Sequence, residues 1–528
     1  MVSRAEIEAW IADDVDPAAA AQLQALVDAG DEAELSDRFS GPLTFGTAGL
    51  RGPLRAGPNG MNRTVVRRAA SGLATWLTHQ GFAGRPVVVG FDARYGSADF
   101  ARDSAEVVAA AGFAARLMPA PLPTPVTAFA VQRFDAAAGV MVTASHNPPQ
   151  DNGYKVYAAD GAQIVPPADT EIESAIRAVG SSRTIPLTAA GVTELDDSIV
   201  ADYVASVAAL VAPGPRRLSI VYTAMHGVGA QIAQRVFAAA GFAPMVAVPQ
   251  QEHPDPDFPT VAFPNPEEPG ALDLSFDLAA SVRADLIIAN DPDADRCAVA
   301  VPLPSGSWRM LRGDEVGVLL ADALMRKGIR GTYATTIVSS SLLGRLAAAR
   351  GVGYAETLTG FKWISRAAPD LVYGYEEALG YAVAPWLVRD KDGLSAALLV
   401  AELAASLRAA GSSLLGRLDE LAAEFGRYAT DQLSVRVTEP AEIADAMQRL
   451  RAAPPARLLG RPVDVTDLLP DADVVRLSFA GGRVVVRPSG TEPKLKAYLE
   501  VVEASGSALI AGARLADLKS EMAAALGL

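Results

Sequence analysis

The alternation of short apolar runs with alanine-rich stretches constrains the fold more than any other feature of this sequence. RPVVVGFDAR at 85–94 precedes SADFARDSAEVVAAAGF at 97–113, and RLSIVYTAMHGVG at 217–229 precedes AQIAQRVFAAAGF at 230–242. Runs rich in β-branched residues form buried strands, whereas the alanine-rich stretches have the length and spacing of helices. The alternation predicts parallel α/β units, with the loops at the strand ends as the expected place for a functional site.

The chain has 528 residues, more than one hydrophobic core usually organises, so we expect three or four domains. The opening segment, 1–40, predicts helices packed on the first domain. The C-terminal part has β-branched runs around a glycine turn and a terminal helix, which predicts an α+β domain. The predicted domains are 1–205, 206–303, 304–422 and 423–528, of which the first three are α/β.

The chain is acidic, with a formal net charge of −15. This argues against a general nucleic-acid binder, because phosphate backbones are held by clustered Lys and Arg. No stretch approaches the ~20 apolar residues that span a bilayer, and the N-terminus lacks the pattern of a secretory signal. We therefore expect a cytoplasmic protein that binds neither nucleic acid nor membrane. Its single cysteine, Cys297, excludes an intramolecular disulfide and is expected to be a buried, inert strand residue.

The most informative segment is GVMVTASHNPPQDNGYKVY at 139–157, where an apolar run passes into a polar loop. A serine hydroxyl can carry a phosphoryl group if one neighbour activates its oxygen and another neutralises the transferred charge. Ser145 is the candidate carrier, and His146 and Lys155 are candidates for both supporting roles. Taken alone, a Ser-His pair beside a Pro-Pro turn is more often a capping or turn feature.

A second segment, DPDADR, follows the apolar run DLIIAN and places Asp291, Asp293 and Asp295 at alternate positions. Alternating carboxylates on an extended loop can converge on one hard cation. A calcium EF-hand loop is excluded, because its glycine and glutamate positions hold Arg296 and Pro302. Three acids directly after a buried strand would repel one another without a cation, so we favour a metal site over a solvated turn.

Two further loops contain candidate functional residues, but their patterns are less specific. GYEEALGY at 374–381 has adjacent acids that suit sugar hydroxyls, although such a pair is commonly a solvated helix start. RPSGTEPK at 487–494 follows the run RVVV and reads as an anion-binding loop. Its arginine supplies a bidentate fork, and its hydroxyls and backbone N–H groups would complete a phosphate cradle.

In this order, the four segments resemble those of the α-D-phosphohexomutase superfamily, the phosphoglucomutases and phosphomannomutases, over essentially the full chain. TASHNPPQDNGYK resembles the family's serine loop, DPDADR its metal loop, GYEEALG its sugar loop and RPSGTEP its phosphate loop. Phe45–Gly52 is similar to the family's N-terminal glycine-arginine segment, which places Arg51 near the serine. The resemblance implies four domains around a central cleft, three of them similar mixed α/β domains and the fourth a C-terminal α+β domain.

The resemblance also implies a mechanism, in which phosphorylated Ser145 donates to a sugar monophosphate and recovers the other phosphoryl group from the bisphosphate intermediate. Mg²⁺ would be held by the three aspartates and the Ser145 phosphoryl oxygen, and a sugar bisphosphate of the glucose 1,6-bisphosphate type would act as activator. Lys155 and Arg51 should act beside the serine. The residues that match substrate positions are Arg296, Thr359, Gly360, Glu376, Lys391, Arg487, Ser489, Gly490, Thr491 and Lys496, with Lys391 and the last five expected at the non-transferring phosphate.

One departure concerns the sugar. Family members commonly have a serine two residues after the first sugar-loop glutamate, whereas this chain has Ala378. The loop is most similar to the branch of phosphopentomutase-like and bisphosphate-synthesising members. We therefore expect a mutase acting on glucose or mannose phosphates, with pentose phosphates or bisphosphate synthesis as the alternative. The expected partner is a small phosphosugar, and the protein could be a monomer or a homodimer.

Two rival functions are weaker. HGVGAQI has two glycines at the spacing of a dinucleotide-binding loop, but Ile232 replaces the third glycine and no acid follows about twenty residues later. A non-catalytic sugar-phosphate sensor would be expected to lose the serine or the aspartates, and both are intact.

Overall fold

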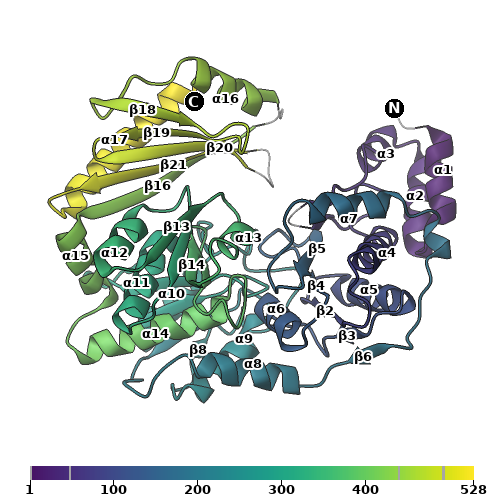
Figure 1. The fold of residues 1–528 in the computed structure, drawn as a ribbon, viewed down its shortest axis with the longest axis horizontal. Coiled ribbons are helices and arrows are strands. Elements are labelled where there is room, and N and C mark those ends of the chain that lie inside the picture. Colours follow the sequence, from purple (N-terminus) through teal and green to yellow (C-terminus); the bar gives the residue numbers. More distant parts are fainter. Residues whose placement is uncertain (1–2, 47–48, 438–440, 490–493, 528) are drawn as a thin grey trace. The chain divides into compact units, whose positions relative to one another are not determined.

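The computed structural model describes residues 3–46, 49–437, 441–489 and 494–527. It divides into two compact units, which are residues 1–311 with 380–405 (unit 1) and residues 312–379 with 406–528 (unit 2). The described strands form four sheets, whose positions along the chain follow the colours of Figure 1. This confirms the α/β class.

The chain opens with three capped helices, α1 (Arg4–Asp13), α2 (Pro17–Ala29) and α3 (Glu32–Arg38). Ser3 and Glu6 form a capping box that satisfies otherwise unpaired N–H groups at the start of α1. The three helices share a small apolar core. Thr64, at the start of the next helix, donates a hydrogen bond of 2.7 Å to Asp14 and so ties them to the first sheet's helices.

The first sheet of unit 1 has the order β1-β5-β4-β2-β3-β6. The strands β2, β3, β4 and β6 are parallel, while β5 is antiparallel to β4 and β1 to β5. Because β4 and β5 are antiparallel neighbours, the loop between them turns sharply, which sets the place of Ser145. The elements are β1 (Leu50–Pro53), α4 (Arg63–His79), β2 (Val87–Phe91), α5 (Ser97–Ala110), β3 (Ala115–Leu117), α6 (Thr124–Arg133), β4 (Ala138–Val142), β5 (Asp151–Ala158), α7 (Ala168–Arg177), a 3₁₀ turn (Ser182–Thr184), β6 (Val192–Glu194) and α8 (Ser198–Ala208).

The second sheet of unit 1 has the order β11-β10-β9-β7-β8. The strands β7, β8 and β9 are parallel, but β10 and β11 are antiparallel. Both sheets of unit 1 therefore combine parallel and antiparallel strands, which confirms the mixed α/β domains that the resemblance implies. The short loop after β9 cannot make the crossover of about a dozen residues that a parallel neighbour needs. The elements are β7 (Ile220–Thr223), α9 (Gly229–Ala239), β8 (Val246–Ala247), α10 (Asp273–Val282), β9 (Leu286–Ala289), β10 (Ala298–Pro302) and β11 (Trp308–Met310).

Unit 2 begins with a parallel arrangement in which β12 pairs with both β13 and β14. Its strands are covered by helices in the βα order that the sequence predicts. The elements are α11 (Gly313–Arg326), β12 (Thr332–Thr336), α12 (Leu342–Arg350), β13 (Gly353–Thr357), α13 (Phe361–Ile364), β14 (Leu371–Glu376) and α15 (Leu414–Phe425). Between them the chain passes through unit 1 as β15 (Gly380–Ala382) and enters α14 (Gly393–Ala409).

The C-terminal sheet is antiparallel, with the order β16-β21-β20-β19-β18-β17, and it packs one core with the helices α16 and α17. This is the α+β arrangement predicted for the end of the chain. The elements are β16 (Arg427–Arg436), α16 (Ala441–Ala452), β17 (Arg457–Leu458), β18 (Arg461–Asp467), β19 (Val475–Phe479), β20 (Gly482–Pro488), β21 (Lys494–Glu503) and α17 (Ala508–Leu526).

Among the described residues, no single helix is both long and apolar enough to cross a membrane, and only α14 and α15 taken together as a bent pair meet the length and composition test.

The close packing of α11 on β14 yields a stability prediction. A Cβ at Gly317 would lie 2.5 Å from the ring of Tyr375, which is fully buried. Gly317→Ala should therefore lower the free energy of unfolding by about 1–3 kcal/mol through overpacking. A Cβ at Gly512 in α17 would meet nothing within 4 Å, so Gly512→Ala should stabilise by up to about 1 kcal/mol. Denaturant unfolding of both variants checks the pair, and equal effects would contradict the packing account.

Candidate active site

Ser145 lies in the turn between β4 and β5 with a backbone φ of 53°, a left-handed value that is uncommon for a residue with a side chain. Its N–H donates to the Thr143 hydroxyl at 2.8 Å. Its hydroxyl donates to Asp291 Oδ2 at 3.0 Å and lies 3.2 Å from His146 Nδ1. The strained turn therefore aims the serine oxygen at the aspartate loop.

A buried arginine holds this turn in place. Arg94, just after β2, donates to the carbonyl oxygens of Ser145 at 2.7 Å and Pro148 at 2.8 Å, and to those of Asn147 and Asp151. One guanidinium thus supplies hydrogen bonds to four carbonyls that the turn leaves without ladder partners.

The three aspartates converge as predicted. One carboxylate oxygen from each of Asp291, Asp293 and Asp295 lies within 4.8 Å of the other two, and all three residues are buried. They come from the loop between β9 and β10, where Ala294 has a φ of 55°. No helix flanks this loop, in keeping with the exclusion of an EF-hand.

The HGVG turn supports the aspartate loop from behind. A Cβ at Gly227 would lie 2.2 Å from the Cα of Pro292, and Val228 N–H donates to the Pro292 carbonyl at 2.8 Å. Only glycine permits so close an approach of two backbones. The glycines considered for dinucleotide binding therefore serve packing beneath the acidic loop.

Two of the aspartates are held in place through one carboxylate oxygen, and their other oxygen has no donor among the residues that the structure describes. Asp293 Oδ2 accepts from Lys155 Nζ at 2.6 Å and from the Thr124 hydroxyl at 2.6 Å, and Asp295 Oδ2 accepts from Lys155 Nζ at 2.9 Å. Asp293 Oδ1 and Asp295 Oδ1 are buried and accept no hydrogen bond within the described part of the chain. Buried carboxylate oxygens without donors are the ligands that a hard divalent cation takes, so the site fits a metal ion.

The pKa values of the site residues are shifted by burial and by the charges of their neighbours. Burial, with the neighbouring charges of Asp293 and Asp295, raises the pKa of Asp291 well above its usual range. Burial alone would lower the pKa of Lys155, but the same two carboxylates raise it above its ordinary value, so this amine stays charged. Burial, with the positive charges of Arg296 and Arg51, lowers the pKa of His146 well below 6.5, which leaves a neutral imidazole beside Ser145 at pH 7.

Three further cations that the sequence singles out lie in unit 1. Arg51 donates to Asn147 Oδ1 at 3.1 Å from β1, which pairs with β5. Arg296 Nε lies 4.0 Å from Asp291 Oδ2 and 3.9 Å from an oxygen of Asp295. Lys391 Nζ lies 3.4 Å from Asp295 Oδ2. The contacts of Lys391 are thus with the aspartate loop, whereas the resemblance grouped it with Arg487, which belongs to unit 2.

The sugar loop lies in unit 2 at the end of β14. Glu377, which follows Glu376, accepts from the Ser339 hydroxyl at 2.8 Å and from Thr336 at 3.2 Å. These contacts fix the second acid of the loop, while Glu376 is half-buried. Of the other positions predicted for the sugar, Gly360 has a φ of 108° at the start of α13, next to Thr359.

The predicted phosphate-binding cations face each other on one sheet. Arg487 in β20 is directly opposite Lys496 in β21, and Ser489 N–H donates to the Lys494 carbonyl at 2.8 Å. Like charges at directly opposite positions destabilise a strand pair, which favours an anion between them. Gly490 and Thr491 lie outside the described residues, as do residues 47 and 48 of the glycine-arginine segment.

Sequence reasoning missed Arg94, Thr124 and Tyr498. Burial, with the charge of Glu377, raises the pKa of Tyr498, while Arg487 opposes this shift. Arg94 had a signal, because FDAR places a charged pair directly after a buried strand at the expected functional edge. Thr124 and Tyr498 had none.

Arg94 gives a testable consequence. Arg94→Lys should lower the free energy of unfolding by about 3 kcal/mol or more, because an ammonium cannot reach the carbonyls that the guanidinium fork spans. The exposed Arg102, which pairs with Glu194, is the matched control, and Arg102→Lys should change stability by at most about 1 kcal/mol. Denaturant unfolding measures both variants. Equal small losses would contradict the role given to Arg94.

Comparison with known proteins places this site in a family. Models of domains I, II, III and the C-terminal domain of phosphoglucomutase/phosphomannomutase match residues 42–183, 201–303, 312–425 and 433–516. A protein from Haemophilus influenzae named as a probable phosphomannomutase is 47% identical over 84% of this chain and 93% of its own. The phosphopentomutase of Mus musculus is 35% identical over 95% of this chain and 90% of its own. A crystal structure from Thermus thermophilus, assigned as a phosphomannomutase, has a TM-score of 0.72 and 27% identity and covers 90% of this chain and 99% of its own. This chain belongs to the phosphoglucomutase/phosphomannomutase family.

Proposed function

We propose that the protein is a phosphosugar mutase that interconverts the 1-phosphate and 6-phosphate of glucose, mannose or both, with Ser145 as phosphoryl carrier. The observation that carries the proposal is the 3.0 Å contact between the Ser145 hydroxyl and one carboxylate of the buried aspartate cluster. A nucleophilic hydroxyl beside a candidate cation site suits phosphoryl transfer, whose barrier is lowered mainly by positioning and charge neutralisation.

In the proposed reaction, the phosphoryl group on Ser145 passes to the free hydroxyl of a bound sugar monophosphate. The P–O bond to serine breaks, a P–O bond to the sugar forms, and the proton that the sugar hydroxyl loses ends on the leaving serine oxygen. The resulting bisphosphate turns around and returns its other phosphoryl group to Ser145. A sugar bisphosphate of the glucose 1,6-bisphosphate type would therefore prime an unphosphorylated enzyme.

The residues around Ser145 have complementary roles in this scheme. Asp291, Asp293 and Asp295 would hold Mg²⁺, which supplies Lewis-acid stabilisation of phosphoryl oxygens when bound. Lys155 stays charged and lies beside the same carboxylates, so it can neutralise charge on the transferring group. His146, neutral at pH 7, can accept the proton that Ser145 releases when it is rephosphorylated.

We also propose substrate-binding roles for residues of unit 2. Glu376 would accept hydrogen bonds from sugar hydroxyls, and Arg487 with Lys496 would bind the phosphate that is not transferred. Ala378 removes one hydroxyl contact from this loop. A loop that holds its sugar by fewer groups discriminates less among sugars.

A phosphopentomutase or a sugar-bisphosphate synthase is the second candidate. The similarity to the mouse phosphopentomutase over 95% of this chain supports it, and so does Ala378. Values of kcat/KM for glucose, mannose and ribose 1-phosphates would rank the substrates. A ribose value above both hexose values would favour the pentose assignment.

Removal of the carrier hydroxyl tests the catalytic scheme. Ser145→Ala should reduce conversion of glucose 1-phosphate to glucose 6-phosphate by at least about 10³-fold, because a nucleophile has no substitute in the site. Ser305→Ala changes an exposed loop hydroxyl and should leave the rate unchanged. A coupled assay of both purified variants is sufficient. Substantial activity in Ser145→Ala would refute the carrier role.

The metal assignment predicts linked effects on activity and stability. Chelation by EDTA should abolish activity, and Mg²⁺ should raise the Tm of the wild type but not of Asp293→Asn, because a ligand that binds only the folded state stabilises it. Asp277→Asn, which alters an exposed carboxylate, should respond like the wild type. Because the pKa of Asp291 is raised, protons compete with the cation and the Mg²⁺ effect on Tm should weaken as pH falls. An unchanged Mg²⁺ response in Asp293→Asn would argue against this site.

A further inference from the structure

The segment that carries Lys391 is held on both sides of the lysine by buried tyrosines. Tyr157 donates to Asp390 Oδ2 at 2.9 Å, and Tyr203 donates to Asp392 Oδ1 at 2.8 Å. Both tyrosine side chains are fully buried, and both aspartates are at most 2% exposed. Hydroxyl donors to a buried carboxylate are strong, costly contacts to lose, so the segment has little freedom.

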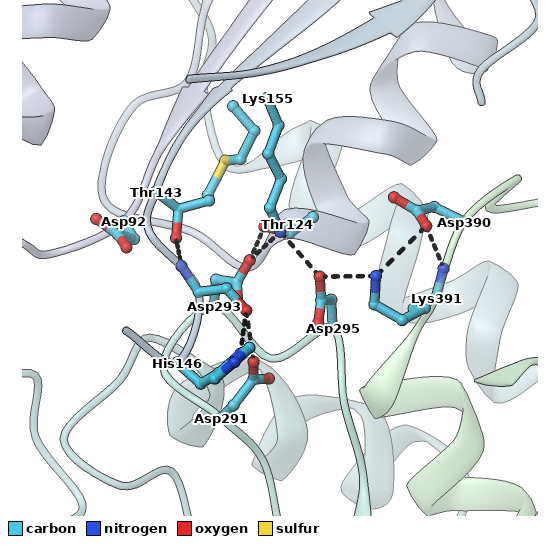
Figure 2. Close-up of polar contacts among 12 residues, drawn as sticks. Asp92, Thr124, Thr143, His146, Lys155, Asp291, Asp293, Asp295, Asp390 and Lys391 are labelled. Atoms are coloured by element: carbon cyan, nitrogen blue, oxygen red, sulfur yellow. Dashed lines mark hydrogen bonds and ion pairs between the residues drawn. The ribbon is translucent and has the colours of Figure 1, made fainter. Parts of the chain in front are cut away.

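Asp390 in turn fixes Lys391 itself. Asp390 Oδ2 also accepts from Gln163 Nε2 at 2.8 Å, while Oδ1 accepts from the Lys391 backbone N–H at 2.8 Å and lies 3.9 Å from Lys391 Nζ. Figure 2 shows the resulting line of contacts from Lys155 through Asp295 and Lys391 to Asp390.

Strand β5 contributes Lys155 at one end of this line and, at the other end, Tyr157, which bonds Asp390. Lys155 and Tyr157 are two residues apart on β5 and therefore project from the same face. Lys155 Nζ lies 2.9 Å from Asp295 Oδ2, and Lys391 Nζ lies 3.4 Å from the same oxygen. The strand thus fixes one cation directly and the other through Asp390.

The lysine segment also contacts the aspartate loop through its backbone. Gly393 N–H donates to the Ala294 carbonyl at 3.2 Å, and a Cβ at Gly393 would lie 2.2 Å from the Arg296 carbonyl oxygen. Lys391 is therefore placed against the acidic loop from two directions.

We propose that Tyr157 acts through Asp390 as a positioning residue for Lys391, and that Lys391 so placed neutralises charge on the phosphoryl group in transfer. The inference rests on the proposed mutase activity. A lysine side chain has many rotamers, and its ammonium group stabilises the transition state less when it is not held close to the reacting group. Loss of the Tyr157 hydroxyl should therefore lower kcat and leave substrate binding nearly unchanged.

Tyr157 can play this role over a wide pH range. Burial, with the negative charge of Asp390, raises its pKa well above 10, so the hydroxyl remains a donor wherever the enzyme is assayed.

The test compares two tyrosine hydroxyls. Tyr157→Phe should reduce kcat for glucose 1-phosphate by about tenfold with KM within about twofold of wild type. Tyr203→Phe is the matched control, because Asp392 Oδ1 also accepts from the backbone N–H groups of Leu394 and Ser395 and so stays fixed, whereas Asp390 is the carboxylate that lies 3.9 Å from Lys391 Nζ. Its kcat should stay within about twofold of wild type. An unchanged kcat in Tyr157→Phe, or an equal loss in Tyr203→Phe, would overturn the proposal.

A double-mutant cycle separates positioning from general damage. If Tyr157 acts through Asp390, Tyr157→Phe should cost no further activity in the Asp390→Asn background, whereas additive losses would overturn the proposal. If Tyr157→Phe does not fold, Gln163→Met replaces it, with a lower kcat expected and an unchanged kcat overturning the inference. A wild type inactive on every phosphosugar overturns the proposed function, while an active wild type with an unaffected Tyr157→Phe overturns only the positioning role.

Discussion

The convergence of three buried carboxylates on one point is the constraint on which the site in unit 1 depends. Asp291, Asp293 and Asp295 are buried away from water. Like charges so close together repel one another and destabilise the fold unless nearby positive charge neutralises them. The chain supplies part of that charge through Lys155 and Lys391 and leaves two carboxylate oxygens without donors among the described residues. Those oxygens are what a bound cation would satisfy.

The surrounding backbone is shaped to keep this arrangement rigid. Ser145 and Ala294 both adopt left-handed conformations, which persist only where neighbouring contacts enforce them. Arg94 enforces the first through the carbonyls of the serine turn, and the close approach of Gly227 to Pro292 supports the loop that contains the second. Preorganisation of this kind lets the site stabilise a developing charge without rearranging.

Much of unit 1's site could be predicted from sequence because its loops follow buried apolar strands. Ser145 and the aspartates each follow such a strand, and the edge where strands end is where sites form in α/β folds. The antiparallel direction of β10 was not predicted, because the residues of an apolar run do not specify the direction of the strand within the sheet. Arg94 was missed because its partners are backbone carbonyls, which every residue has.

The place of Lys391 could not be derived from local pattern at all. Its contact with Asp295 joins positions far apart in sequence, and its segment, 380–405, belongs to unit 1 although the chain before and after that segment belongs to unit 2. For the phosphate strand, the facing of Arg487 and Lys496 depends on the register of β20 and β21, which neither run specifies alone. Tertiary contacts, more than residue types, decide where each of these cations lies.

The central claim is that Ser145 is the phosphoryl carrier, and its most direct test is intact-mass analysis with peptide mapping after incubation with glucose 1,6-bisphosphate and Mg²⁺. The account predicts one added phosphate, located on the peptide that contains Ser145 and removed by a phosphatase. A protein that gains no phosphate, or gains it on another residue while turning over substrate, would contradict the account.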